Sequence, residues 1–491
     1  MIRRFKELLF QNRSTRQTIT KNIFWLSVSQ IASRLIRAVI IIYAARVLGA
    51  ADYGLFSYLL GLAGFFTIFS DIGVNTILTK EITQKPEQTS VYFSTAFWIK
   101  IFLFATTTAI VMIAGPHFSK LPGAASMLYF VVMIIIFDGL REFSQSIFRA
   151  REKMELEAFA NILTNLSITV LGFTVLYFSV SLKLLTFSYA IATGIGAFAA
   201  IFIIRKEFEK LFSHFKKDMV KPIINSAWPI ALTGIIGAFM LNTDILMLGW
   251  WRTAQEIGFY SAGQKIIQAL YTLPAIIAGA TFPTISRLIG QQNHEKIKQL
   301  MEVAMTAIFL MSVPMAIGGI ILGKSIIALI YGNEYLPAAV SFQILMTTIF
   351  IIFPGTLIGN SILAYGKQKK LAVYMMIAAF GNIALNAILI PIYGIVGSAI
   401  ATITSQFISN ILAWRMIKKI NNFKTFIHVK KIIFAGIVMG AASFIFNKFG
   451  LNVIINIIIS AGIYFLVLYL LKEKAIEEIK NLFKLARIMP Q

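Results

Sequence analysis

The chain has 491 residues, of which 58% are hydrophobic and only 13% are charged, and its formal net charge is +24 at pH 7. This composition lies far outside the range of soluble globular proteins. The absence of cysteine excludes disulfides, thiolate metal sites and cysteine catalysis.

About fourteen apolar runs of roughly twenty residues follow one another from Lys21 to Leu471. A bilayer core about 30 Å thick needs ~20 mostly apolar residues for each spanning helix. The runs are too long and too continuously apolar for the alternating strands of a membrane barrel. The sequence therefore predicts an all-α polytopic membrane protein with about 14 transmembrane helices, arranged as two parallel six-helix lobes plus two C-terminal helices.

The expected spans, in chain order, lie at 22–46, 52–73, 91–114, 125–148, 157–179, 183–204, 222–249, 258–283, 299–323, 337–364, 371–390, 394–415, 431–447 and 452–471. The stretch 320–336 is ambiguous, because it either extends the ninth helix or forms a short cap. The expected domains are an amphipathic N-terminal segment (1–21), an N-lobe (22–204), a basic linker (205–221), a C-lobe (222–415), a basic loop (416–430), two further helices (431–471) and a tail (472–491).

Orientation follows from the lysines and arginines, of which 34 lie on the side of the N-terminus and six on the opposite side. Short cytoplasmic loops carry the excess of these residues. We therefore expect a multi-pass protein of the cytoplasmic (inner) membrane with both termini in the cytoplasm. Its basic ends favour contact with anionic membrane lipids. The basic residues form no stripe with interleaved aromatics, so no nucleic acid partner is expected.

The two halves of the chain share short motifs in the same order. Segments 52–57 (DYGLFS) and 256–261 (EIGFYS) both read acid, apolar, Gly, apolar, aromatic, Ser. The pair Asn161 and Asn165 matches Asn382 and Asn386, and AIAT occurs at 190–193 and 399–402. Because each half begins on the same side and has an even number of spans, the repeats are parallel, an arrangement found in transporters.

Five cations fall inside expected spans, where a charge is costly and rarely faces lipid. They are Arg34, Arg37, Lys100, Arg141 and Lys265, and all five are candidate substrate-binding residues of a cavity. The acids within the spans are Asp71, Asp138, Glu142 and Asp244, of which the last three are candidates for charge pairing or coupling.

Arg34 and Arg37 share one helix face near mid-bilayer, so they require an anion nearby. Either Asp138 or Glu142 supplies it, or a bound phosphate does, since the guanidinium fork suits phosphate.

The sequence also suggests charge partners for two of the other three cations. Asp138 and Arg141 stand three residues apart on one helix and can neutralise each other. Asp244 and Lys265 lie at similar heights on neighbouring helices, so we expect a pair. For Lys100 the sequence offers no partner.

Gly54 and Gly258, each beside an acid at a helix entrance, are candidate gate positions or else ordinary turn glycines. No nucleotide-binding loop, catalytic triad or metal-ligand cluster occurs, so we expect no enzyme, no cofactor and no metal site.

Two segments resemble a known family. Residues 37–82 (RAVIIIYAARVLGAADYGLFSYLLGLAGFFTIFSDIGVNTILTKEI) resemble the start of bacterial polysaccharide-unit flippases, in the polysaccharide transporter family of the multidrug/oligosaccharidyl-lipid/polysaccharide exporter superfamily. Residues 382–406 are similar to that family's eleventh-to-twelfth helix region. The resemblance implies two six-helix lobes with two extra helices. It also implies translocation of undecaprenyl-pyrophosphate-linked oligosaccharide by alternating access, for O-antigen, capsule or exopolysaccharide synthesis.

Polysaccharide polymerase or glycosyltransferases are candidate protein partners of such a flippase. Three alternatives stay open: a peptidoglycan lipid-precursor flippase, a multidrug and toxin extrusion antiporter, and a membrane scaffold that transports nothing. The antiporter is disfavoured because the first helix carries two arginines and no acid, although Asp244 keeps it open.

Overall fold

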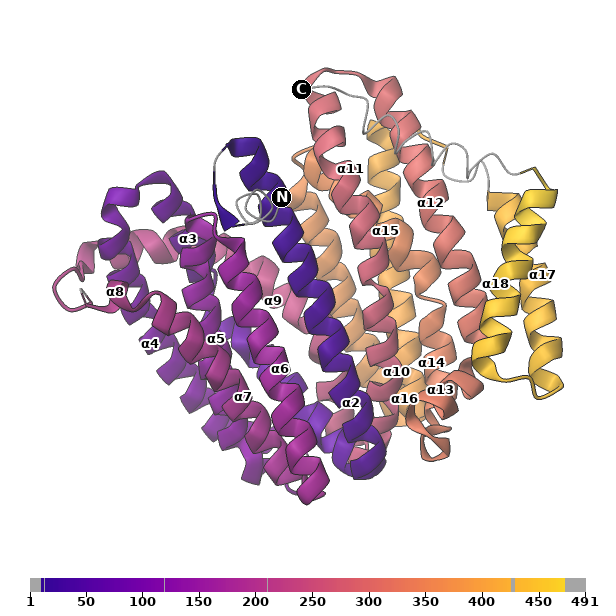
Figure 1. The fold of residues 1–491 in the computed structure, drawn as a ribbon, viewed down its shortest axis with the longest axis horizontal. Helices are drawn as coiled ribbons and strands as arrows, with labels where there is room; N and C mark the ends of the chain where they lie inside the picture. Colours follow the sequence, from indigo (N-terminus) through magenta and orange to yellow (C-terminus); the bar gives the residue numbers. More distant parts are fainter. Residues whose placement is uncertain (1–9, 13, 119, 210, 425–428, 473–491) are drawn as a thin grey trace, which may run out of the picture. The chain divides into compact units, whose positions relative to one another are not determined.

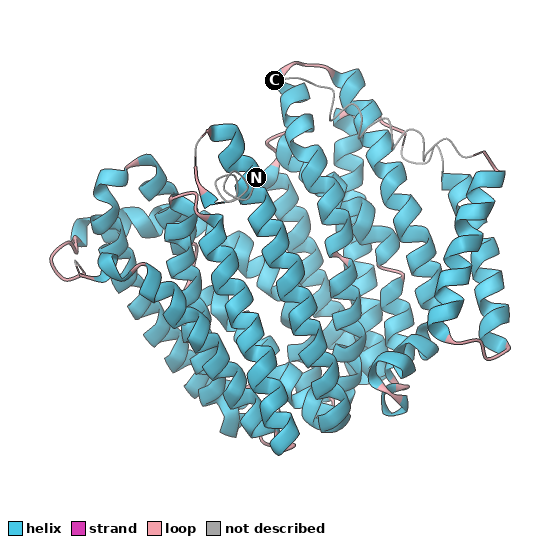
Figure 2. Cartoon of the chain, viewed as in Figure 1, coloured by secondary structure: helices cyan, strands magenta, loops and turns pink. Residues whose placement is uncertain are grey.

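The computed structural model describes residues 10–12, 14–118, 120–209, 211–424 and 429–472, and within them it contains helices and no strand (Figure 2). The helices of the first half are α2 (Thr15–Thr67), α3 (Val74–Gln84), α4 (Thr89–Ala114), α5 (Leu128–Ala150), α6 (Met154–Phe178), α7 (Leu182–Ile203), α8 (Arg205–Phe208) and α9 (Val220–Trp251). Those of the second half are α10 (Ala254–Leu270), α11 (Thr272–Gly290), α12 (His294–Ile321), α13 (Gly323–Tyr331), α14 (Ala338–Met346), α15 (Ile349–Ala364), α16 (Gln368–Ile420), α17 (Val429–Lys448) and α18 (Val453–Leu470). Short 3-10 turns lie at Ile68–Ser70 (η1), Pro86–Gln88 (η2), Gly115–His117 (η3), Ala125–Met127 (η4), Lys217–Met219 (η5) and Asn333–Tyr335 (η6).

The predicted membrane class is confirmed. Within the described chain, nine helices are long and apolar enough to cross a membrane, or ten if the bent pair α14 and α15 forms one span. That number leaves out α2 and α5, which cover the expected first, second and fourth spans. The fourteen expected spans thus fall on helices, with 258–283 and 337–364 each divided between two consecutive ones, and the protein is a multi-pass membrane protein.

Two of the helices each contain a pair of expected spans. Both α2 and α16 run for 53 residues, about 80 Å at 1.5 Å per residue, far more than a bilayer core requires. Each has one non-helical residue, Gly49 (φ 75°) in α2 and Gly394 (φ 59°) in α16. Side chains disfavour this region of φ, so glycine suits the break. Around the second break the chain turns back on itself, since a Cβ on Gly397 would lie 2.2 Å from the carbonyl oxygen of Leu389.

Two expected connections differ from the prediction. The region 73–90, expected as a loop, holds the eleven-residue helix α3, whose buried face includes Val74, Ile77 and Leu78. Its apolar residues are too few to span a bilayer, so the hydropathy pattern did not reveal it. The ambiguous stretch 320–336 forms a separate short helix, α13, after a break at Leu322.

The described residues group into two compact units, Met1–Gly258 and Phe259–Gln491 (Figure 1). In the first, α2 packs along α6 and against α5 and α9, and α7 packs against α5 and α6. In the second, α15 packs against α11, α12 and α16, and α17 packs against α12 and α18. The first unit includes α9 and therefore one expected span more than the expected N-lobe, and the division into repeated lobes remains a prediction.

A buried apolar cluster in the first unit gathers the ends of several helices. Its members come from α3, α4, α5, α6, α7 and the beginning of α9, and include Ile77, Phe93, Phe143, Ile147 and Ile223. Burial of side chains of this size contributes about 1.5–3 kcal/mol each. The cluster thereby holds the start of α9, and the linker that precedes it, against the rest of the unit.

Candidate functional site

Arg34 and Arg37 lie in the first half of α2, where Arg34 is exposed and Arg37 is partly buried. The Nε of Arg37 donates a hydrogen bond of 2.7 Å to Oδ1 of Asn165 on α6. Among the residues that the structure describes, no carboxylate lies within 4.0 Å of either guanidinium. Two positive charges on one helix therefore lack a protein counter-ion in this part of the chain.

A chain of buried amides positions Arg37. Asn165 is only 4% exposed, and its Nδ2 donates to the carbonyl oxygen of Asn161 at 2.7 Å. The side-chain oxygen of Asn161 in turn accepts from Nε2 of Gln145 at 2.9 Å. These bonds use only the Nε of Arg37, and its two terminal nitrogens form no hydrogen bond to a described residue. The free side of the guanidinium is the side that binds a phosphate in a bidentate manner.

The exposed face of the first half of α2 carries a row of polar side chains and, beside it, a row of apolar ones. Ser27, Gln30 and Arg34 are exposed and follow one another at spacings of three and four residues, so they share a row. Beside them, Ile31 and Leu35 are 54% and 65% exposed. The sequence predicts that this part of α2 lies near mid-bilayer, where an arginine does not face hydrocarbon without a large cost. At that depth the polar row would need water or a polar ligand, whereas the neighbouring row suits hydrocarbon.

Lys100 on α4 has a partner that the sequence did not reveal. Its Nζ lies 3.1 Å from Oδ1 of Asp71, and the lysine side chain is 1% exposed. The Asp71 carboxylate also accepts hydrogen bonds from the backbone N–H groups of Gly73 and Asn75, both at 3.2 Å, at the start of α3. The sequence offered no partner for Lys100 because the pair joins two segments 29 residues apart.

Arg141 belongs to a network on α5 and α6. Its Nη1 lies 2.8 Å from Oδ1 of Asp138, which confirms the expected i,i+3 pair, and its Nη2 lies 3.8 Å from Glu142. Glu142 also pairs with Arg149 at 3.3 Å, and Arg149 pairs with Glu157 at 2.7 Å. Asp138 and Glu142 therefore serve other arginines, and the expectation that one of them neutralises Arg34 and Arg37 is wrong.

Asp244 and Lys265 lie in different units. Asp244 is 5% exposed on α9, and Lys265 is partly buried on α10. Their pairing stays a prediction, which a charge-swapped double variant tests: recovery of transport lost in both single variants would support it, and no recovery would contradict it. Among the described residues no group of three or more histidines and carboxylates is arranged to hold a metal ion.

Gly54 and Gly258 contact each other's helices. A Cβ on Gly54 would lie 1.7 Å from the carbonyl oxygen of Ala254, and a Cβ on Gly258 would lie 2.0 Å from that of Ala50. Both glycines lie inside helices, α2 and α10, and neither has a positive φ. The turn-glycine interpretation is therefore wrong. Here α2 and the start of α10 cross with their backbones in contact, as small residues permit.

Comparison with known proteins decides the family. The model of the family described as "Polysaccharide biosynthesis protein" matches residues 19–289, more than half of the chain. The chain belongs to this family. The MatE family model also matches residues 229–388 of this polysaccharide biosynthesis family member.

Two similar curated proteins are named as flippase and transporter. The "Probable low-salt glycan biosynthesis flippase Agl15" of Haloferax volcanii is 23% identical over 87% of this chain and 89% of its own length. The "Putative O-antigen transporter" of Shigella flexneri is 22% identical over 78% of this chain and 94% of its own length.

The fold is also shared with a solved structure, "Lipid II flippase MurJ, inward closed conformation", at a TM-score of 0.74 and 16% identity. That match covers 92% of this chain and 100% of the other. At this identity the likeness shows the fold alone.

Proposed function

We propose that the protein is a flippase that moves polyprenyl-pyrophosphate-linked oligosaccharide across the cytoplasmic membrane for surface polysaccharide synthesis. The observation that carries the proposal is the pair Arg34 and Arg37. Lys100 and Arg141, elsewhere in the same unit, have carboxylate partners, whereas this pair has none among the described residues. A diphosphate supplies the missing negative charge, and the lipid carrier accounts for the apolar row beside the polar one.

The names of the similar proteins support the substrate class, since they are a glycan biosynthesis flippase and an O-antigen transporter. The head of such a substrate is anionic and its carrier is apolar, which matches the polar and apolar rows of α2. With no nucleotide-binding loop in the sequence, we propose that transport proceeds by alternating access, in which ligand binding shifts a pre-existing equilibrium between states. We also propose the orientation that the lysines and arginines predict, with both termini in the cytoplasm.

The test is a flipping assay on the full chain in sealed proteoliposomes. The lipids carry the same polyprenyl-pyrophosphate tail and differ in the head: a surface-polysaccharide repeat, a peptidoglycan precursor, or no sugar. We expect the repeat unit to be flipped fastest. Faster transport of the peptidoglycan precursor would establish the alternative of a peptidoglycan lipid-precursor flippase. Transport of none of the three would contradict a flippase and favour a scaffold.

We also propose that the crossing of α2 and α10 at Gly54 and Gly258 separates during transport. Since a methyl group on Gly54 has no room in the closed crossing, Gly54→Ala should favour the separated state. The chain has no native cysteine, so Ser57→Cys, at a position 5% exposed, reports on opening through its rate of labelling by a membrane-impermeant maleimide. Gly237→Ala is the matched control, because a Cβ there meets nothing within 4 Å. Equal labelling in Gly54→Ala and the control would contradict the gate.

A further inference from the structure

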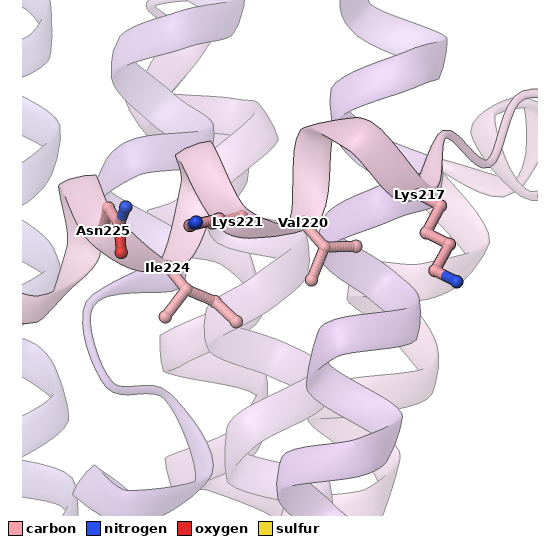
Figure 3. A pocket seen from close by; sticks show the side chains of 5 residues that line it. All are labelled: Lys217, Val220, Lys221, Ile224 and Asn225. Carbon is pink, nitrogen blue, oxygen red and sulfur yellow. The ribbon is translucent and has the colours of Figure 1, made fainter.

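A hollow of about 530 Å³ lies at the beginning of α9, and none of the residues discussed above line it. Its lining consists of Lys217, Val220, Lys221, Ile224 and Asn225 (Figure 3). On α9, Lys221 and Asn225 stand four residues apart, as do Val220 and Ile224 beside them, and Lys217 precedes them in the turn η5. Cationic and apolar side chains thus share one concave surface.

The two lysines are available for a ligand. Both are exposed, and among the described residues neither has a carboxylate within 4.0 Å. The acid nearest in sequence, Asp218, is also exposed. Lys217, in the turn η5, and Lys221, in the first turn of α9, lie on either side of Val220 (Figure 3), so an anion held between them is attracted by both ammonium groups.

The apolar row continues deeper along α9. Ile224, Trp228 and Leu232 are 37%, 56% and 44% exposed and recur every four residues. Seven residues separate Lys221 from Trp228, about 10 Å along the axis. The indole of Trp228 is amphipathic. A tryptophan about 10 Å along a helix from the nearer of two lysines is typical of the boundary between lipid head groups and acyl chains.

The surface is held in place from behind. Ile223 and Ala227, on the opposite face of the same turns, are buried in the apolar cluster with Val74 and Phe93. The preceding linker is fixed to α4, where the backbone N–H of Lys216 donates to Thr95 Oγ1 at 3.3 Å. The turns that carry the hollow are therefore fixed to the rest of the unit before any ligand arrives, so binding does not have to order the backbone, which lowers its entropic cost.

We infer that this hollow binds one anionic phospholipid of the surrounding bilayer, with its phosphate at Lys217 and Lys221 and one acyl chain along Ile224, Trp228 and Leu232. Charge complementarity selects the anionic head, because a zwitterionic lipid presents its own ammonium to the two lysines. In the proposed orientation the lipid belongs to the cytoplasmic leaflet, which carries the anionic lipids. This site does not depend on the transport activity proposed above.

The test uses the full chain in nanodiscs with tracer amounts of photoactivatable lipid. Phosphatidylglycerol and phosphatidylcholine carry the same diazirine-bearing acyl chain, and labelled peptides are mapped after illumination. We expect phosphatidylglycerol to label the segment 220–232 at least fivefold more than phosphatidylcholine. The double variant Lys217→Gln/Lys221→Gln should reduce that labelling to the phosphatidylcholine level.

The matched control is Lys369→Gln/Lys370→Gln, which removes the same charge from two adjacent exposed lysines elsewhere. It should leave the labelling unchanged. An equal reduction by both double variants would show a general surface potential and overturn the site, as would equal labelling by the two lipids. Inorganic phosphate that abolishes labelling, where sodium chloride of equal ionic strength does not, would show a site for a free anion and overturn the lipid assignment. Matching thermal unfolding of the variants and the parent confirms that each is folded.

Discussion

Two groups of arginines in the first unit differ in their surroundings. On α5 and α6, Arg141 and Arg149 meet three carboxylates, those of Asp138, Glu142 and Glu157. On α2, Arg34 and Arg37 meet none among the described residues, and an amide holds one of them in place. A charge inside a membrane is therefore not by itself a sign of a binding site. What distinguishes the α2 pair is a fixed cation without a fixed anion.

The largest expected effect is on stability, at the buried pair of Lys100 and Asp71. Lys100→Met leaves the carboxylate of Asp71 without its cation, and breaking a buried pair costs about 3–5 kcal/mol. Since the Asp71 side chain is 22% exposed, we expect the lower end of that range. The measurement is thermal unfolding in detergent, and Lys100→Met/Asp71→Asn should recover part of the loss. Wild-type stability combined with lost transport would instead make Lys100 a ligand of the substrate.

The second effect is on transport, at the α2 pair. A hydrogen bond to a charged group contributes about 1.5–3 kcal/mol, so Arg34→Ala or Arg37→Ala should slow flipping by roughly 10- to 150-fold. Arg37→Lys should restore only part, because an ammonium lacks the bidentate fork. Arg34→Ala separates transport from stability better than Arg37→Ala does. Because Arg34 is exposed, this variant should unfold at nearly the wild-type temperature.

The matched control for these variants is Arg151→Ala. Arg151 is a partly exposed arginine of the same unit, and its pair with Glu207 near the membrane surface is of a kind that contributes about 0–1 kcal/mol. Normal flipping by Arg34→Ala and Arg37→Ala would remove the distinction between the two groups of arginines.

The smallest effect is expected at Asn165, which positions Arg37 without needing to touch the substrate. Asn165→Leu leaves the charge of Arg37 in place and removes only one bond that orients it, so we expect a loss of about 0.5–1.5 kcal/mol, roughly a 2- to 13-fold slower rate. In the Arg37→Ala background the same substitution should have no further effect on flipping, as a double-mutant cycle reveals. Asn386→Leu, at the matching buried position of α16, controls for the loss of an amide. Additive effects of Asn165→Leu and Arg37→Ala would contradict the positioning role.

Local patterns predicted well what lies within one helix. The apolar runs predicted the helices in their observed order, and i,i+3 spacing gave the pair of Asp138 and Arg141. Contacts between helices left no comparable signal. Lys100 and Asp71 are 29 residues apart with no shared periodicity, so only packing brings them together.

Asn165 was predicted only in part. The sequence marked it through the internal repeat, but its bond to Arg37, 128 residues earlier, required the structure. Gly54 and Gly258 likewise were marked by the repeat, while their crossing at backbone contact was not predicted.

The bonds between α2 and α6 have a consequence for biosynthesis. Arg37 enters the membrane 128 residues before Asn165, and Lys21, whose side chain is 0% exposed, pairs at 2.9 Å with Glu155 on the same later helix. At about 5–20 residues per second, the ribosome needs roughly 6–26 s to supply that partner. During this interval Arg37 and Lys21 lack their final contacts, so they depend on the insertion machinery or on water for solvation. The first span to be made therefore reaches its final contacts only after four further expected spans have been synthesised.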